Sequence, residues 1–425
     1  MKTAFPLFAG QCVSAMARLA AGMLLGTAMG AVAAAPKLPY SYFSVGDPAI
    51  TPVISPSDKP ATPSYVIMGG GPDVDTAFQW MIQRAGIKPG TGGRFVIIRA
   101  TGTEAYNPYI YYSDANGGTS TLPPTNQDGW VGGAYLGLSS VETLVIPSVT
   151  AANHPTVNQI VARADAVFIA GGDQSDYVKY WKNTPLDWTL QSLMNRKVPI
   201  GGTSAGLAVL GQFDFAALRG GVTSAQALSN PFNKYMSVDP TPQTLTPTSS
   251  SAPGGAFLAP PVLFNTILDA HVDERDRMGR LVTFVSRLIT PYYGAGCSGG
   301  ILVPREAQSL SPTPYGDIVA RGIGVGVEAA LLVSGNGAAS SPITATLVTN
   351  PTTTTRSAAY FVLPQNYPGQ CTSGKALSGV TATVVKVDRL NPTFNLSTWS
   401  GGYAPYTLTV TNGVMTVSGN GGDPY

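Results

Sequence analysis

Short apolar, β-branched runs alternate along the first half of the chain with segments whose apolar positions recur at helical spacing. This pattern predicts strands at residues 65–68, 95–98, 144–146 and 166–170, and a further run beginning at Val198. It predicts helices at residues 75–85, 158–164 and 188–195. Strand, glycine turn and helix follow one another in that order, which indicates an α/β domain with a mostly parallel sheet.

The pattern changes after Thr344, where Thr, Ser, Gly and Val alternate, as in residues 380–385 and 406–410. Period-two alternation of this kind is typical of strands. These strands form either a small sandwich or an addition to the main sheet. We therefore expect an α/β domain at 35–340, with a Pro/Ser/Thr/Gly-rich insertion at 239–261, and a β-rich region at 341–425.

Residues 1–34 have the features of an export signal. Lys2 and Arg18 supply positive charge, and residues 19–35 are apolar and rich in small side chains that fit a cleavage site. The sequence thus predicts a secreted or periplasmic protein without a membrane anchor. Removing Lys2 and Arg18 leaves 23 of the 25 basic residues against 23 acidic ones, so nothing in the charge favours a nucleic-acid partner.

Two cysteines remain after the signal, Cys297 and Cys371. An oxidising compartment favours a disulfide between them, and the alternative is two unpaired, buried thiols. Two cysteines and two histidines cannot build a usual zinc site, and no HExxH pattern occurs, so we expect no metal and no cofactor.

The sequence Gly202-Thr203-Ser204-Ala205-Gly206 lies between an apolar run and a small-residue segment with helical tendency. This context is typical of a nucleophile elbow, a strand-to-helix turn that exposes a serine. A second Gly-x-Ser-x-Gly pattern surrounds Ser298, but no helical segment follows it, so we interpret it as a loop. Ser204 is therefore the candidate nucleophile.

A base for this serine must come from His154 or His271. His154 precedes a proline at a predicted helix start, which favours a structural role. His271 lies in a stretch, residues 269–277, in which six of nine residues are charged. That stretch is either a solvated helix start or the rim of a pocket with His271 at its entrance.

Three ordered motifs decide between these interpretations. They are Phe168-Ile169-Ala170-Gly171-Gly172-Asp173-Gln174, the elbow, and an Asp-x-His-x-x-x-Arg-x-Arg-x-Gly-Arg-Leu segment that begins at Asp269. Together they resemble exported cyanophycinases, which belong to the dipeptidase E clan of serine peptidases. The resemblance implies a fold of the class I glutamine amidotransferase or flavodoxin-like type and a homodimer. It also implies hydrolysis of cyanophycin, a poly-aspartate with arginine on each β-carboxyl, to β-Asp-Arg dipeptides.

The resemblance assigns roles to particular residues. Ser204 is the nucleophile and His271 its general base, and the backbone N–H groups of Gly172 and Ala205 form the oxyanion hole. The remaining positions line the substrate pocket: Gln174, Asp269, Arg275, Arg277 and Arg280.

The sequence departs from the family pattern at several positions. Ala270 replaces a usual glutamine, and Pro72-Asp73-Val74 replaces a usual acid-acid-Lys. The third triad member, a strand glutamate, aligns on Val327 or, with a shift of one residue, on Glu328. We predict Glu328, with Asp269 as the alternative acid behind His271.

The predicted function is an exported serine peptidase that hydrolyses cyanophycin through an acyl-enzyme on Ser204. The alternatives are another Asp- or isoaspartyl-directed dipeptidase of the clan and a non-catalytic binding homologue. An α/β-hydrolase esterase is disfavoured, because its acid lies between serine and histidine in the chain and no histidine follows His271.

Overall fold

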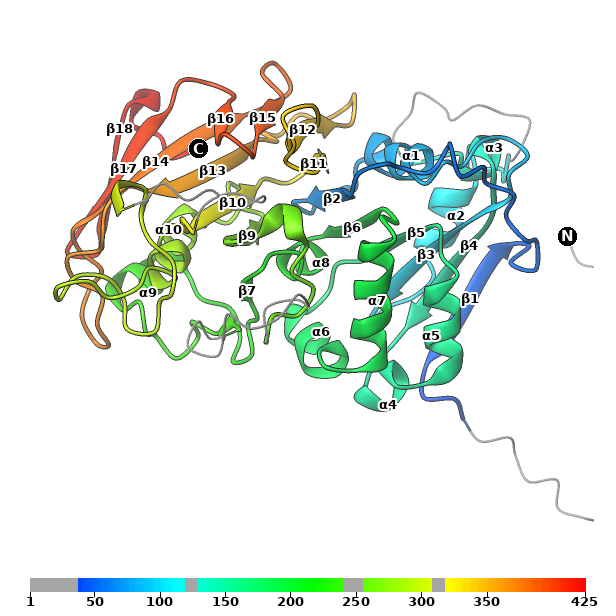
Figure 1. The fold of residues 1–425 in the computed structure, drawn as a ribbon, viewed down its shortest axis with the longest axis horizontal. Coiled ribbons are helices and arrows are strands. Elements are labelled where there is room, and N and C mark those ends of the chain that lie inside the picture. Colours follow the sequence, from blue (N-terminus) through cyan, green and yellow to red (C-terminus); the bar gives the residue numbers. More distant parts are fainter. Residues whose placement is uncertain (1–36, 119–128, 241–254, 308–317) are drawn as a thin grey trace, which may run out of the picture. The chain divides into compact units, whose positions relative to one another are not determined.

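The computed structural model describes residues 37–118, 129–240, 255–307 and 318–425 (Figure 1). Contacts divide the chain into Met1–Leu38 and Pro39–Tyr425, and the second unit holds every element described below. The predicted signal at 1–34 and most of the predicted insertion at 239–261 lie outside the described residues. None of the helices within the described ranges is long and apolar enough to cross a membrane.

The first sheet, sheet A, has five parallel strands at its centre, β4, β3, β5, β6 and β2. Strand β1 pairs antiparallel at one side, and β11, β12, β15 and β16 continue the sheet antiparallel at the other. In spatial order the strands are β1 (Ser41–Gly46), β4 (Leu138–Val145), β3 (Gly93–Arg99), β5 (Ala166–Ile169), β6 (Ile200–Thr203), β2 (Ser64–Met68), β11 (Ala329–Ser334), β12 (Thr344–Thr349), β15 (Thr393–Asn395) and β16 (Ser400–Gly401).

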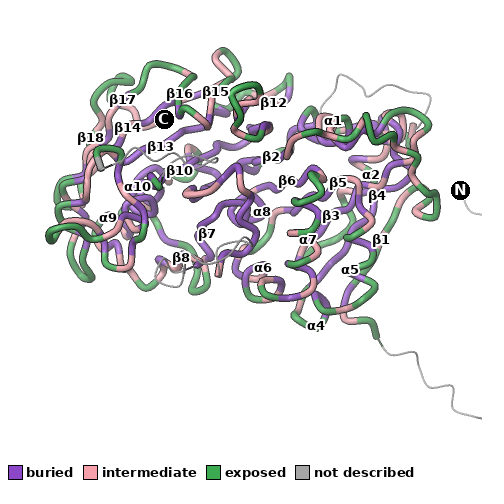
Figure 2. The backbone as a smooth tube through the Cα atoms, in the orientation of Figure 1, coloured by how far each residue is buried: buried purple, intermediate pink, exposed green. Residues whose placement is uncertain are grey.

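The central strands of sheet A are buried (Figure 2). Helices cover both faces of the sheet, because these strands carry apolar side chains on both sides. One apolar cluster joins Ile67 and Ile169 to the helices α5 to α8, and the other joins Val66 and Phe168 to α1 and α2. The helices are α1 (Asp75–Arg84), α2 (Tyr106–Tyr111), α3 (Gly133–Leu136), α4 (Val149–Ala152), α5 (Pro155–Ala162), α6 (Gln174–Trp181), α7 (Pro185–Asn195), α8 (Ala205–Ala208), α9 (Ser224–Ser229) and α10 (Met278–Arg287).

The second sheet, sheet B, pairs a short parallel unit with strands from the C-terminal region. Its order is β18 (Val414–Ser418), β17 (Tyr406–Thr411), β14 (Val380–Val387), β13 (Ala359–Pro364), β10 (Arg321–Val325) and β9 (Thr266–Ala270). Only the β9–β10 pairing among these is parallel. A separate two-stranded antiparallel sheet consists of β7 (Asp214–Phe215) and β8 (Val238–Asp239). The strands after residue 341 thus extend both sheets.

The chain passes from sheet B to sheet A between β10 and β11, at residues 326–328. Glu328 has a left-handed backbone there, with φ of 56°, and its N–H donates to the carbonyl of Gly70 at 2.8 Å. The N–H of Gly69 in turn donates to the carbonyl of Ala329 at 2.9 Å. These bonds join the end of β2 to the crossing, so the two sheets meet beside the carboxyl end of β2.

The sequence prediction of a mixed α/β domain with parallel strands and a β-rich C-terminal part is confirmed. The particular amidotransferase or flavodoxin-like type stays a prediction. Strand β4 begins six residues before the predicted run at 144–146. Its first part was not predicted because it carries polar side chains, which are buried together with hydrogen-bonding partners. The carboxylate of Glu142, for example, accepts from Tyr42 at 2.6 Å and from Arg163 at 2.5 Å.

Cys297 and Cys371 form the disulfide expected from the sequence, with their Cα atoms 4.9 Å apart. Cys297 follows α10 and Cys371 lies between β13 and β14. The bond therefore ties the loop after α10 to the C-terminal strands of sheet B.

Candidate active site

Ser204 lies at a sharp turn between β6 and α8. Its backbone has φ of 52° and ψ of −110°, a conformation that non-glycine residues rarely adopt. A Cβ on Gly202 would lie 2.4 Å from the carbonyl oxygen of Gly206, and a Cβ on Gly206 would lie 2.0 Å from the carbonyl oxygen of Ile169. The two glycines that flank the serine are thus required by close approach of the backbone, as the elbow pattern predicted.

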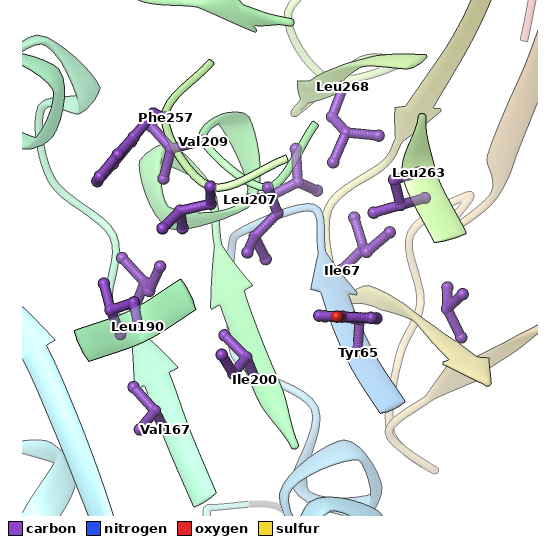
Figure 3. Close-up of a cluster of buried hydrophobic side chains, with 14 of the residues drawn as sticks. Tyr65, Ile67, Val167, Leu190, Ile200, Leu207, Val209, Phe257, Leu263 and Leu268 are labelled. Carbon is purple, nitrogen blue, oxygen red and sulfur yellow. The ribbon is translucent and has the colours of Figure 1, made fainter. Parts of the chain in front are cut away.

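Apolar side chains directly after the elbow anchor it to the core. Leu207 and Val209 are fully buried and point into the same cluster as Ile67 of β2 and Ile200 of β6 (Figure 3). The N–H of Ser204 also donates to the carbonyl of Met68 at 3.0 Å. The helix that follows, α8, has only one turn.

His271 reaches Ser204 from the other sheet. It directly follows β9, and its N–H donates to the carbonyl of Gly69 at 2.9 Å, which fixes it against the end of β2. Its Nε2 lies 2.9 Å from Ser204 Oγ, within hydrogen-bonding distance. The candidate nucleophile and base therefore meet where sheets A and B join, although they lie 67 residues apart in the chain.

The acid behind His271 is Glu274. Its Oε2 lies 2.9 Å from His271 Nδ1. Because an ionised carboxylate only accepts hydrogen bonds, Nδ1 carries the proton and Nε2 is left to accept the hydroxyl proton of Ser204. This is the tautomer that a general base needs.

The electrostatic surroundings keep both partners in their working charge states. Burial lowers the pKa of His271, the hydrogen bond with Glu274 opposes that effect, and the guanidinium groups of Arg275 and Arg277 lower the pKa further. The hydrogen bond with His271 lowers the pKa of Glu274. At neutral pH the imidazole is therefore neutral and the carboxylate is charged.

The structure corrects the predicted acid. Glu328 occupies the crossing between the sheets, and in the described part of the chain no side-chain hydrogen bond or ion pair reaches it. Its backbone forms the left-handed bend from β10 to β11, and the carboxylate bonded to Nδ1 is that of Glu274. The alternative acid, Asp269, is bonded to Arg280 instead.

A cavity of about 280 Å³ opens beside Ser204. Its walls come from the turn after β5, from the elbow, from the segment after β7 and from the turn that follows β9. All the predicted oxyanion and substrate positions line it: Gly172, Gln174, Ala205, Asp269, Arg275, Arg277 and Arg280. The structure thus gathers into one cavity residues that lie up to 108 positions apart in the sequence.

The charged side chains of this cavity differ in how far other groups of the protein already bind them. Arg280 and Asp269 are buried and form a bidentate pair, at 2.7 and 2.5 Å. Arg277 donates to the carbonyl of Ala270 at 2.7 Å and lies 3.8 Å from Asp269, and burial lowers its pKa to about 10. Arg275 is half exposed. Since Asp269 neutralises Arg280, the remaining charged side chains of the lining are Arg275, Arg277 and Asp173. Two positive charges against one negative charge leave the cavity with a net positive charge, which suits a carboxylate group.

The turn after β5 lies against the serine, as an oxyanion hole requires. A Cβ on Gly171 would be 3.5 Å from the Cβ of Ser204, and the next residue, Gly172, lines the cavity together with Ala205. Gln174, at the start of α6, donates to the carbonyl of Phe215 at 3.3 Å and so holds the β7 segment against the cavity.

The remaining candidates take structural positions. His154 caps α5, where its Nδ1 accepts from the N–H of Thr156 at 3.2 Å. Ser298 is exposed in the loop after α10, beside Cys297. In the ranges that the structure describes, no group of three or more His, Cys, Asp or Glu side chains is arranged to hold a metal ion.

A serine hydrogen-bonded to a neutral, carboxylate-oriented imidazole is equipped for nucleophilic attack on an acyl carbon. The three side chains thus have the geometry that a serine–histidine–acid triad requires. Comparison with known proteins points to a peptidase: residues 134–216 match the model described as Peptidase family S51. The matched segment contains Ser204, Gly172 and Gln174 but stops before His271.

Other comparisons add little to this match. A crystal structure of a peptidase from an acI-B1 Actinobacterium aligns with 15% identity and a TM-score of 0.35, covering 68% of this chain and 89% of that one. A TM-score this low does not define the fold. No curated protein matches the chain. The family match thus supports a peptidase, and its substrate is a separate question.

Proposed function

We propose that this protein is an exported serine peptidase that cleaves cyanophycin to β-Asp-Arg dipeptides. The observation that carries the proposal is the hydrogen-bonded chain Ser204–His271–Glu274 at the edge of an arginine-lined cavity. The resemblance of the three sequence motifs to cyanophycinases supplies the substrate, and the features of residues 1–34 supply the export.

The proposed reaction assigns one task to each group. Ser204 Oγ attacks the backbone carbonyl of the polymer while its proton passes to His271 Nε2, and the N–H groups of Gly172 and Ala205 hold the oxyanion. His271 then returns the proton to the leaving amine, which leaves an acyl group on Ser204. Water hydrolyses this ester with the same histidine as base, and Glu274 stabilises the imidazolium in both steps.

The positive charge of the cavity suits an aspartyl polymer. Arg275 and Arg277 can hold the carboxylate that lies next to the scissile bond, and Gln174 and the carboxylate of Asp173 in the same cavity can accept contacts from a guanidinium. A neutral peptide would offer these two guanidinium groups no carboxylate.

Digestion of insoluble cyanophycin with the purified protein, followed by mass measurement of the soluble products, tests the proposal. We expect β-Asp-Arg from the wild type and a loss on the order of 10⁴-fold in Ser204→Ala and in His271→Ala. Near-normal turnover by either variant would exclude this mechanism.

A second candidate is a peptidase of the same type that acts on other aspartyl or isoaspartyl dipeptides. The observation that favours it is Ala270, which lines the cavity where the cyanophycinase pattern has a glutamine. Release of free amino acids from such dipeptides, with cyanophycin left intact, would establish this candidate instead.

A further inference from the structure

Tyr425 contacts the turn that carries the candidate base and acid. Its hydroxyl donates to Asp276 Oδ1 at 2.8 Å and accepts from the N–H of Met278 at 3.0 Å. Met278 is the first residue of α10, and residues 271–277 form the turn between β9 and that helix. One hydroxyl thus bonds both to the turn and to the start of the helix that follows it.

The turn needs external bonds because its backbone is strained. His271 has φ of 52° and Asp276 has φ of 47°, and a left-handed conformation persists in non-glycine residues only when the surroundings enforce it. Within the turn the N–H of Arg277 donates to the carbonyl of Val272 at 2.8 Å. From outside, Ser224 Oγ donates to the carbonyl of Asp276 at 2.5 Å, and the hydroxyl of Tyr425 holds the Asp276 side chain.

Tyr425 is itself held in place. Its ring packs edge-on against Tyr360 of β13, with the ring centres 5.8 Å apart. The hydroxyl of Tyr406 in β17 donates to the carbonyl of Pro424, the residue before Tyr425, at 2.6 Å. Arg356 forms an ion pair at 2.7 Å with Asp423. These contacts connect the hydroxyl rigidly to sheet B.

Packing alone does not hold Glu274 against His271. The Glu274 side chain is 49% exposed and lines a cavity of about 440 Å³ whose other walls include Tyr425 and Arg356. A half-exposed carboxylate keeps its place only if the backbone that carries it is fixed.

We propose that Tyr425 is a positioning residue, whose hydroxyl fixes the turn at 271–277 and thereby keeps Glu274 bonded to His271 Nδ1. This role rests on the proposed serine hydrolase function of the same site. It assigns a catalytic purpose to part of the β-rich C-terminal region.

The first test measures how fast a fluorophosphonate probe labels Ser204. We expect Tyr425→Phe and Asp276→Ala each to slow labelling by about threefold to tenfold, because small misplacement of a base lowers the rate steeply. The double variant should be no slower than the slower single variant, since both remove the same bond. Tyr403→Phe is the matched control and should label at the wild-type rate, because its hydroxyl bonds Asp388, away from the turn.

The second test needs no catalysis. His271 and His154 are the two histidines of the chain, so an NMR spectrum of imidazole N–H protons is assigned with a single His154→Gln variant. In Tyr425→Phe the Nδ1–H proton of His271 should exchange with solvent at least about three times faster than in the wild type, because its bond to Glu274 is broken more often.

Wild-type labelling and N–H exchange in both Tyr425→Phe and Asp276→Ala would overturn the positioning role. If the wild-type protein is not labelled at all, the proposed function fails, and the N–H exchange still decides whether Tyr425 fixes the turn. Slower labelling with faster exchange in both variants supports the positioning role.

Discussion

Ser204 and His271 both have left-handed backbones, with φ of 52° in each. Such conformations cost of order 1–3 kcal/mol each and persist where the surrounding structure enforces them. Here the enforcing contacts are the bond from Ser204 N–H to Met68 and the bond from His271 N–H to Gly69, both to the end of β2. These two bonds therefore hold Ser204 and His271 in the backbone conformations in which their side chains meet.

Exchanging a carboxylate for an amide at the two glutamates distinguishes their roles. Glu274→Gln should lower kcat by at least about tenfold, because an amide stabilises the imidazolium less and permits the wrong tautomer. Glu328→Gln should stay within about twofold of the wild type, because its role lies in the backbone. Steady-state kinetics on the same substrate provides the measurement, and the reverse order of effects would return the acid to Glu328.

The pH dependence follows from the lowered pKa of His271. Only the neutral imidazole accepts a proton, so kcat/KM should rise with pH and reach half its plateau below the ordinary histidine value of about 6.5. Arg275→Gln removes a charge that lowers the pKa, so its midpoint should move up, whereas Glu274→Gln should move it down. Midpoints that shift together, or not at all, would contradict this electrostatic account.

At the scale of elements, the site depends on how closely the end of β2 approaches the chain crossing between the sheets. Strand β6 of sheet A supplies Ser204, and β9 of sheet B supplies His271. These two strands do not pair with one another. The end of β2 connects them, because Met68 accepts from the N–H of Ser204 and Gly69 accepts from the N–H of His271. A Cβ on Gly69 would lie 1.9 Å from the carbonyl oxygen of Gly326.

Gly69→Ala should therefore force the two sheets apart. We expect the free energy of unfolding to fall by at least about 2 kcal/mol, as for other overpacking changes, and labelling of Ser204 to fall with it. Gly369→Ala is the control, because its Cβ would meet its nearest neighbour at an ordinary 3.6 Å. Denaturant titration of both variants checks the prediction, and equal stabilities would refute the close approach.

At the scale of the whole molecule, the C-terminal strands pack against α10, the helix that follows the turn at 271–277. Leu281 and Phe284 of α10 pack in one apolar cluster with Val362 of β13, Val384 of β14 and Leu408 of β17. The disulfide closes the same region, since it joins the loop after α10 to the segment between β13 and β14. The C-terminal region thus packs against the helix that follows His271 and Glu274.

Loss of the disulfide should weaken this support without removing the triad. In the loop-entropy model, a separation of 74 residues contributes about 4.5 kcal/mol to stability. The variant with both Cys297→Ser and Cys371→Ser should melt at a lower temperature than the oxidised wild type but still label at Ser204 when folded. Calorimetry with and without reductant provides the comparison, and an unchanged melting temperature would count against a stabilising role.

Local signals were enough to predict much of this arrangement. Apolar runs of three to five residues located the parallel strands, and the glycines around Ser204 predicted a turn that the backbone requires. The strand β4 was only partly predicted, because its polar side chains are satisfied by distant partners such as Arg163. Glu274 was missed although it lies three residues from His271, a spacing that a single turn of chain brings together.

The sequence by itself determined the α/β class and the elbow at Ser204, because both depend on residues close together in the chain. It also indicated His271, through the charged residues around it and the order of three motifs. The tertiary structure decided the acid and the function of the C-terminal strands. Both depend on how sheet A meets sheet B: the crossing at Glu328 uses that residue for its backbone bend, and the turn held by Tyr425 presents Glu274 to the histidine.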